Sequence, residues 1–406
     1  MRDGWEAVKL AQCLASLDVR AGRNGPDLVL SVTEKRGIIP QSSVFKNRIA
    51  TADTSKYKVL EKYDIAYNPY LLWCGAIGQW KGESAGVVSP VYECFRVNGN
   101  HDPSFFGLLF ESGALTPYFN STAIGSIERR RRTTPHVFMN AMLSVPPLVE
   151  QRRIVDVVES VDNYIAALQA RVDAARIARN AVLHELLNAG GDGWVETTLG
   201  DCLTRSIGGV WGGEPNSDEE DVLVVRSTEF SSSGVLYFET GVTRSIKKSQ
   251  LASRELRHGD VLLEKSGGGP QQPVGRVVFV NEDIPNRSVC SNFIQLLTPD
   301  QTNAIPKYVF FLMWYWHTSN RTLQFQAQTT GIRNLRTPDY LAQDIELPPL
   351  VEQRRIVEIV SSMDDSVQAT VQTIVEAKNL RSGLLSDLLS GEHEIPKSYD
   401  KLLGAA

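Results

Sequence analysis

The chain has 406 residues, enough for two or three domains, and its hydrophobic content of 42% and charged content of 22% are ordinary for a soluble globular protein. Its net charge of -5 argues against a promiscuous polyanion binder, which is usually basic overall, but leaves room for local basic surfaces. No apolar run reaches transmembrane length, no signal peptide is visible, and the five cysteines lack paired spacing, so we expect a cytoplasmic protein without a membrane segment.

Residues 1–145 predict a first globular region of mixed strands and helices. Short β-type runs at 28–33 and 87–97 are separated by Gly, Asn and Pro, a pattern typical of strands joined by turns. An aromatic stretch at 105–110 predicts a helix. The region closes with a basic turn at 129–135, which begins with consecutive arginines.

A long helix is predicted at residues 146–190, and its sequence returns at 347–392. The motif PPLVEQRRIV occupies residues 146–155 and recurs unchanged at 348–357. After the motif, apolar residues recur at alternating spacings of four and three, which is the seam of a heptad coiled coil. A helix of about 40 residues is roughly 60 Å long, too long to be one wall of an ordinary core. The repeat therefore predicts two coiled-coil helices, followed by a tail at 393–406.

Residues 191–346 predict a second globular region built on a similar frame. The Asp-Gly-Trp triplet at 3–5 returns at 192–194, and the turns at 63–65 and 259–261 look like corresponding strand starts. The second region has its own β-type runs at 222–225, 274–280 and 293–297. An aromatic stretch at 308–316 predicts a helix, and a basic turn follows at 331–338. Similar frames with divergent contents indicate one scaffold that carries two different recognition surfaces.

Each helical seam is interrupted by an arginine at the same position, Arg179 and Arg381. If the two helices run antiparallel, one register places Arg179 near Asp364 and Arg381 near Asp162. Charged or polar residues in a seam often fix the register of a coiled coil, so we predict these two ion pairs. The alternative is that both arginines extend to water.

Catalytic motifs are weak throughout the chain. The sequence at 67–70, Tyr-Asn-Pro-Tyr, resembles the N-P-P-Y loop of amino-methyltransferases but lacks one proline, and no glycine-rich cofactor loop follows an apolar strand. An ordinary turn explains it better. The acidic and lysine residues at 27 and 34–35 lack nuclease spacing, and the cysteines and histidines lack zinc spacing. We therefore predict a chain that is not an enzyme and holds no metal.

Two variable globular regions, each followed by a PPLVEQRRIV-type helix, resemble the specificity subunit of a type I restriction–modification system. The resemblance implies a mixed α/β (α+β) fold with two target recognition domains, at 1–145 and 191–346. An antiparallel pair of long coiled-coil helices would link them in a pseudo-twofold arrangement. Each domain would read one half of a bipartite double-stranded DNA site.

The candidate DNA contacts are the two basic turns and the glycine loop after residue 264. Arginine suits guanine, asparagine and glutamine suit adenine, and a lysine ahead of a glycine loop suits phosphate. The candidates are Arg129, Arg130, Arg131, Arg132, Lys265, Ser266, Gly267, Gly268, Gln271, Gln272, Arg333, Asn334 and Arg336.

The resemblance further implies that the outer faces of the helices dock two methyltransferase subunits and, through them, restriction and translocation subunits. The repeated docking residues would be Glu150, Gln151, Arg152, Arg153, Glu352, Gln353, Arg354 and Arg355. S-adenosylmethionine, ATP and Mg²⁺ would be bound by those partners, with no cofactor in this chain.

Two alternatives remain open. The chain could belong to a related methylation-only or phage-exclusion complex, which the genomic neighbours would distinguish. It could instead be a coiled-coil scaffold whose globular regions bind protein, and in that case mutation of Arg333 would not affect DNA binding.

Overall fold

The computed structural model describes residues 4–45, 50–51, 53–125, 131–215, 220–231, 233–268, 273–285, 287–329, 332–396 and 398–399. The chain divides into two compact units. Unit 1 comprises Met1–Gln169 with Gln372–Ala406, and unit 2 comprises Ala170–Val371. Each unit therefore combines one globular region with one half of each long helix.

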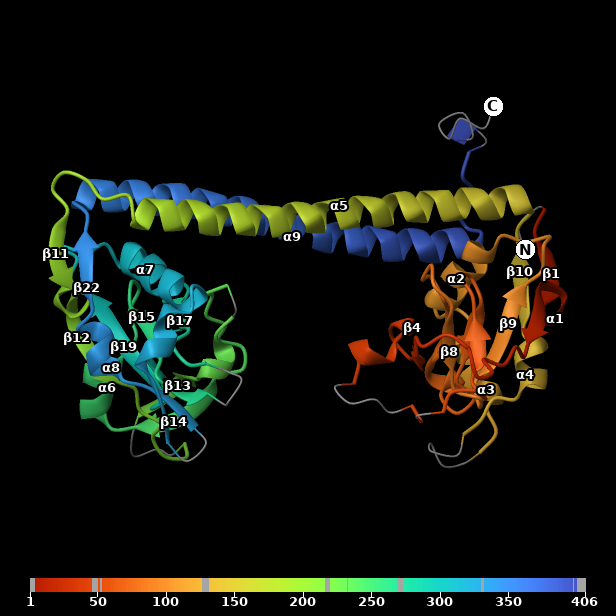
Figure 1. Cartoon of the computed structure of the whole chain (residues 1–406), viewed down its shortest axis with the longest axis horizontal. Helices are drawn as coiled ribbons and strands as arrows, with labels where there is room; N and C mark the ends of the chain where they lie inside the picture. The colour runs from red at the N-terminus through yellow and green to blue at the C-terminus, as the bar shows by residue number, and fades with distance from the viewer. Residues whose placement is uncertain are drawn as a thin grey trace. The chain divides into compact units, whose positions relative to one another are not determined.

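The two predicted long helices are present and uninterrupted (Figure 1). They are α5 (Leu148–Leu187) and α9 (Leu350–Ser390). Each begins directly after a Pro-Pro pair and carries a glutamate in its first turn, Glu150 or Glu352, where a negative charge complements the helix dipole. Neither contains proline, so the hydrogen-bonded ladder continues to the end.

The halves of α5 and α9 pair antiparallel within each unit, as predicted. In unit 1, Val158 near the start of α5 shares a buried cluster with Leu385 near the end of α9. In unit 2, Leu187 at the end of α5 shares a cluster with Ile356 near the start of α9. Early residues of one helix therefore pack with late residues of the other.

Both predicted seam ion pairs are confirmed. Arg179 donates to both carboxylate oxygens of Asp364, at 2.9 and 3.0 Å. Arg381 makes the corresponding pair with Asp162, including a bond of 2.8 Å from Nη2. The Arg179 and Arg381 side chains are only 7% and 15% exposed, so the alternative in which they extend to water is wrong.

The globular region of unit 1 is a small mixed fold. A four-stranded antiparallel sheet has the order β2-β9-β6-β7, and β1 pairs with β10. Hairpin β3-β4 and the pair β5-β8 complete it. Its elements are β1 (Glu6–Lys9), α1 (Leu10–Cys13), β2 (Leu14–Leu17), β3 (Leu30–Thr33), β4 (Gly37–Pro40), β5 (Lys58–Leu60), β6 (Ile65–Tyr67), β7 (Ile77–Gln79), β8 (Gly86–Val88), β9 (Glu93–Val97), α2 (Pro103–Glu111), α3 (Thr116–Thr122), α4 (Pro135–Met139) and β10 (Met142–Val145).

The globular region of unit 2 repeats this frame and adds strands to it. Its four-stranded sheet has the equivalent order β12-β19-β15-β17, and β11 pairs with β22 as β1 does with β10. The sheets β14-β13-β18 and β16-β21-β20 are further parts of this unit. Its elements are β11 (Val195–Thr198), β12 (Leu203–Gly208), β13 (Glu220–Val225), β14 (Val242–Ile246), α6 (Lys248–Arg254), β15 (Val261–Glu264), β16 (Ser266–Gly268), β17 (Val277–Phe279), β18 (Ser288–Cys290), β19 (Ile294–Pro299), α7 (Pro306–Thr318), β20 (Gln326–Thr329), β21 (Ile332–Leu335), α8 (Thr337–Leu341) and β22 (Asp344–Leu347).

The predicted corresponding strand starts are the same turn in both units. Asp64 and Asp260 are each 1% exposed, and each carboxylate accepts the backbone N–H of the residue three positions earlier, at 2.8 Å. Each is also paired with an arginine on another strand of the same sheet, Arg96 of β9 or Arg205 of β12. A buried carboxylate is stable only when it is paired and hydrogen-bonded, and here the arginine and the backbone N–H meet both needs.

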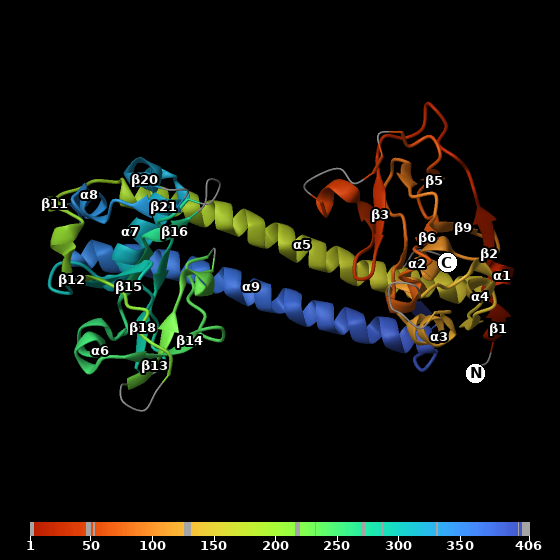
Figure 2. The same cartoon turned by 90° about the horizontal axis from the view of Figure 1, so that it is seen from below.

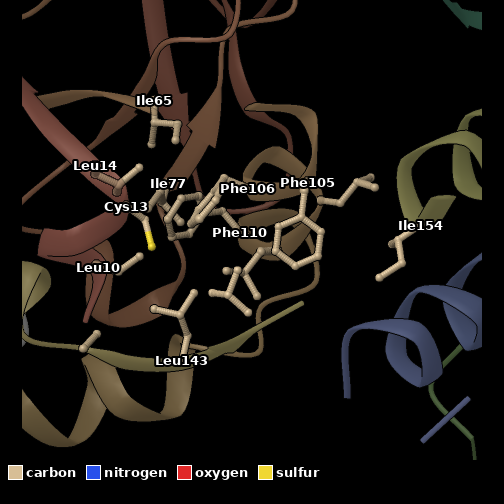
Figure 3. Close-up of a cluster of buried hydrophobic side chains, with 14 of the residues drawn as sticks. Leu10, Cys13, Leu14, Ile65, Ile77, Phe105, Phe106, Phe110, Leu143 and Ile154 are labelled. Carbon is tan, nitrogen blue, oxygen red and sulfur yellow. The ribbon is translucent and has the colours of Figure 1, made fainter. Parts of the chain in front are cut away.

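Aromatic residues of α2 connect the sheet of unit 1 to its long helices. Phe105, Phe106 and Phe110 lie in one buried cluster with strand residues such as Ile65 and with Ile154 of α5 (Figure 3). Helix α7 contributes the equivalent aromatic residues in unit 2. The predicted helices at 105–110 and 308–316 are therefore confirmed, and they are what attaches each sheet to the coiled coil.

One predicted run is divided in two. The stretch at 87–97 forms β8 and β9, separated by a turn that contains Pro90. Proline cannot donate to a strand ladder, so a single strand through this position is unfavourable. None of the helices in the described part of the chain is long and apolar enough to cross a membrane.

Candidate nucleic-acid interface

In both units, the loop that follows the third strand in the sheet order, β6 or β15, is hydrogen-bonded to the segment that precedes a short helix, α4 or α8. In unit 1 the Thr133 N–H donates to the Pro69 carbonyl at 2.9 Å, and in unit 2 the Leu335 N–H donates to the Lys265 carbonyl at 2.8 Å. Because Pro69 follows β6 and Lys265 follows β15, these bonds are structurally equivalent. They bring the basic turn of each region against the loop beside it.

In unit 1 this junction holds stacked arginines and aromatic rings. The Arg131 guanidinium lies 4.7 Å from the ring centre of Trp73, and the Arg132 guanidinium lies 5.8 Å from that of Tyr70. Tyr70 is 43% exposed, and Arg132 is also exposed. The Trp73 indole N–H donates to the Tyr70 carbonyl at 2.9 Å, which fixes the loop. The arrangement offers planar cationic and aromatic groups to a partner.

In unit 2 the equivalent junction is a small sheet, β16-β21-β20 (Figure 2). Ser266 pairs with Asn334 across β16 and β21, and its hydroxyl donates to the Asn334 side-chain oxygen at 2.5 Å. Gly267 forms a bulge in β16, with φ of 105°, a conformation that favours glycine. Arg333, on β21, lies 3.5 Å from the Gln326 side-chain oxygen.

The same two backbone positions therefore carry different side-chain pairs. Counted from the equivalent backbone bonds, Tyr70 corresponds to Ser266 and Arg132 to Asn334. One junction holds a cation against an aromatic ring, and the other holds a hydroxyl against an amide. The sequence pattern indicated Arg132 and Asn334 but not Tyr70, because the loops that hold Tyr70 and Ser266 differ in length and type.

Two of the candidate cations are engaged within the protein. Lys265 is half-buried, its amine donates to Gln295 at 3.0 Å, and burial lowers its pKa. The amine is therefore already bonded within the protein, and its role as a phosphate contact stays a prediction. Arg336 donates to the Gln324 carbonyl at 2.8 Å and lies 3.4 Å from Asp339, but half of its side chain is exposed.

The two glycine candidates differ in exposure, and four other candidates lie outside the described residues. Gly268 is buried and pairs with Arg333, whereas Gly267 is exposed. Arg129, Arg130, Gln271 and Gln272 lie outside the described residues.

The expected docking surface needs a correction at two residues. Gln151 and Gln353 are 1% and 0% exposed, so they do not lie on the outer faces of the helices. Gln151 accepts the N–H of Asp102, the N-cap of α2, at 2.8 Å and donates to the Pro146 carbonyl at 2.8 Å. Gln353 does the same with Ile305, the N-cap of α7, and the Pro348 carbonyl.

These glutamines clamp the aromatic helix of each region onto a long helix. The sequence contained the signal, because Gln151 precedes Ile154 and Val158 at helical spacing and so lies on the buried stripe. The other repeated residues remain at the surface. Arg152, Arg354 and Arg355 are exposed, and Glu150, Arg153 and Glu352 are half-buried.

Asn68, in the sequence that resembles a methyltransferase loop, forms a turn in the structure. The Asn68 side chain accepts the Tyr70 N–H at 3.1 Å, which is the turn preferred over a methyltransferase loop. Among the residues that the structure describes, no three His, Cys, Asp or Glu side chains gather where they could hold a metal ion.

Comparison with known proteins gives the following similarities. Residues 192–379 match the family model described as the type I restriction modification DNA specificity domain. Among solved structures, the chain is 19% identical, with a TM-score of 0.60, to one from work on complex assembly and conformational transition of the type I R-M system, over 96% of this chain and 98% of that chain.

Two further structures are similar at lower scores. The HsdS subunit from Thermoanaerobacter tengcongensis is 20% identical, with a TM-score of 0.49, over 97% of this chain and 98% of that chain. The type I restriction-modification S subunit from M. genitalium is 12% identical, with a TM-score of 0.46, over 97% of each chain.

Proposed function

We propose that this chain, whose residues 192–379 belong to the type I restriction–modification DNA specificity domain family, is the subunit that gives such a complex its DNA sequence specificity. Unit 1 would read one half of a bipartite double-stranded target and unit 2 the other. The specificity-domain family is non-catalytic, so methyl transfer with S-adenosylmethionine and ATP-dependent cleavage with Mg²⁺ would belong to partner subunits in the cytoplasm.

The observation that carries this proposal is the pair of equivalent junctions with different chemistry. Tyr70 with Arg132, and Ser266 with Asn334, stand at the same positions of the same frame. A protein that reads two different half-sites needs a constant scaffold and variable side chains at the reading positions. Arginine is suited to guanine and asparagine to adenine, so the two junctions are chemically able to prefer different bases.

Phosphate contacts by this chain alone would be few. The net charge is -5, and Lys265 and Arg336 already have partners within the protein. Because neutralising phosphates supplies most of the non-specific affinity for DNA, we expect the isolated chain to bind DNA weakly and the assembled complex to bind tightly.

The surfaces offered to methyltransferase subunits would be the starts of the two long helices. Val149 and Val351 are large apolar residues that are 57% and 75% exposed, and each is followed by an exposed arginine, Arg152 or Arg354. Apolar side chains beside arginine are typical of interfaces. Since both helix starts present the same residues, they fit two copies of one partner, through which restriction and translocation subunits would join.

The test is a map of modified bases. The chain is expressed with its neighbouring methylation subunit in a host that lacks methylation, and modified positions are sequenced. A single motif split by a fixed gap is expected. If modification by an active partner is independent of this chain, the proposal is wrong and a scaffold that binds protein explains the coiled coil better.

A further inference from the structure

Each seam ion pair of an arginine and an aspartate has a third partner, which comes from the globular region of the same unit. In unit 1, Arg381 of α9 is paired with Asp162 of α5, and its Nη1 also lies 2.8 Å from a carboxylate oxygen of Glu111, the last residue of α2. In unit 2, Arg179 of α5 is paired with Asp364 of α9 and stacks on rings of α7. Each arginine therefore joins both long helices to the aromatic helix.

The third partners stand at equivalent positions but differ in kind. The N-caps of α2 and α7 are Asp102 and Ile305, which are bound by the equivalent glutamines. Counted from these N-caps, Glu111 and Trp314 occupy the same place in their helices. A carboxylate therefore holds the arginine in unit 1, where an indole ring holds it in unit 2.

The junction in unit 1 is ionic and partly open to water. The Glu111 side chain is 39% exposed and the Arg381 side chain 15%. Hydrogen bonds to Asp162, together with the negative charge of Glu111, raise the pKa of Arg381, so the guanidinium remains charged. Glu111 has a second cationic neighbour, Lys81, at 3.3 Å. Because the Glu111 carboxylate is partly exposed, salt screens this ion pair more than it would a fully buried one.

The junction in unit 2 is aromatic. The Arg179 guanidinium lies 4.3 Å from the ring centre of Trp314 and 5.1 Å from that of Phe311. Its Nη1 is buried and has no hydrogen-bond partner in the described part of the chain. The corresponding nitrogen of Arg381 is the one that contacts Glu111. Contact between a guanidinium and a ring face depends less on salt than an exposed ion pair does.

We propose that Arg381 and Arg179 are positioning residues that hold each recognition domain at a fixed orientation on the paired helices, and so restrict the spacer length of the bipartite target. The inference rests on the proposed function. It assigns an ionic, salt-sensitive attachment to the first domain and an aromatic, salt-resistant one to the second. Loosening either attachment widens the range of accepted spacers, while the half-site sequences stay the same.

The experiment uses the full methylating complex and a library of sites that have fixed half-sites and variable spacers. Glu111→Gln removes the charge of the third partner in unit 1 and preserves its shape. We expect the preference for the wild-type spacer over spacers one base pair longer or shorter to fall roughly three- to tenfold. Lys81→Gln is the matched control, because it removes the other ion pair of Glu111 and leaves Arg381 untouched. It should preserve the preference.

Salt and a second variant separate the two domains. Raising the salt concentration should widen the spacer range of the wild-type complex, and the Glu111→Gln complex should respond less. Trp314→Leu keeps an apolar side chain but removes the ring, so it should relax the spacer in a way that does not depend on salt.

Two results would overturn the inference. One is a Glu111→Gln complex that retains the wild-type spacer preference. The other is a uniform loss of methylation at every spacer, which would indicate a purely structural role. If the wild-type complex produces no split motif at all, the proposed function itself is wrong, and this inference falls with it.

Discussion

The two units share one arrangement of strands and helices, the frame, but carry different side chains at some equivalent positions. The buried aspartate turn, the glutamine clamp and the seam ion pair recur at equivalent places, and their hydrogen bonds have nearly the same lengths. Two places differ completely, namely the junction that holds Tyr70 with Arg132 or Ser266 with Asn334, and the third partner of the seam ion pair. The frame depends on buried, hydrogen-bonded polar groups, whose replacement leaves a partner unsatisfied, whereas the differing positions are at least partly exposed. Side chains at the differing positions can therefore change without disturbing the frame.

The largest effect is expected from reversing a seam charge. Arg381→Glu adds a carboxylate beside those of Asp162 and Glu111, which makes three in contact. The repulsion among them should destabilise unit 1 by about 3 kcal/mol. Denaturant unfolding followed by hydrogen exchange in each unit would measure it. Asp162→Arg should restore much of the stability and Asp364→Arg should not. Equal rescue by both would show that the two seams are not independent.

The glutamine clamps test whether the frame is truly shared. Gln353→Leu leaves the Ile305 N–H and the Pro348 carbonyl without their partner and should cost about 2 kcal/mol in unit 2. Gln151→Leu should cost a similar amount in unit 1. Hydrogen exchange at the N-cap amides of α7 and α2 gives the measurement. A cost confined to one unit would break the equivalence.

On the proposed function, the junction in each unit should affect only one half-site. Arg132→Ala should relax base preference in the half read by unit 1, and Asn334→Ala in the half read by unit 2, each by roughly 1–3 kcal/mol of discrimination. Methylation of targets mutated one base at a time would measure it. Relaxation of both halves by one substitution would contradict the assignment of one junction to each half.

The smallest effect concerns pH and only one clamp. Burial lowers the pKa of His101 below its ordinary value of 6.5, and Gln151 Nε2 lies 3.2 Å from its Nδ1, which must accept and so be unprotonated. Because the unfolded chain binds this proton more readily, unit 1 should lose stability as the pH falls through about 6.5. Gln353 faces the Asn303 carbonyl instead, so unit 2 is the internal control. Equal acid sensitivity of both N-cap amides would exclude His101 as the cause.

The sequence was most informative where structure depends on local periodicity. The heptad spacing and the repeated motif predicted both long helices, and one antiparallel register predicted Arg179 with Asp364 and Arg381 with Asp162. A coiled coil has few registers that pair every charge, so the sequence alone could select one. The resemblance to type I specificity subunits is likewise confirmed, by the family match over residues 192–379.

Tertiary structure decided which side chains meet. Helical spacing alone places Gln151 on the buried stripe, but only the fold supplies the partner of its side-chain oxygen, a helix N-cap about fifty residues earlier in the chain, and the same holds for Gln353. The partners of Arg132 and Arg381, namely Tyr70 and Glu111, also come from distant segments. Periodicity reports only the neighbours along one element. Contacts between elements depend on how loops return the chain, and no local pattern encodes that.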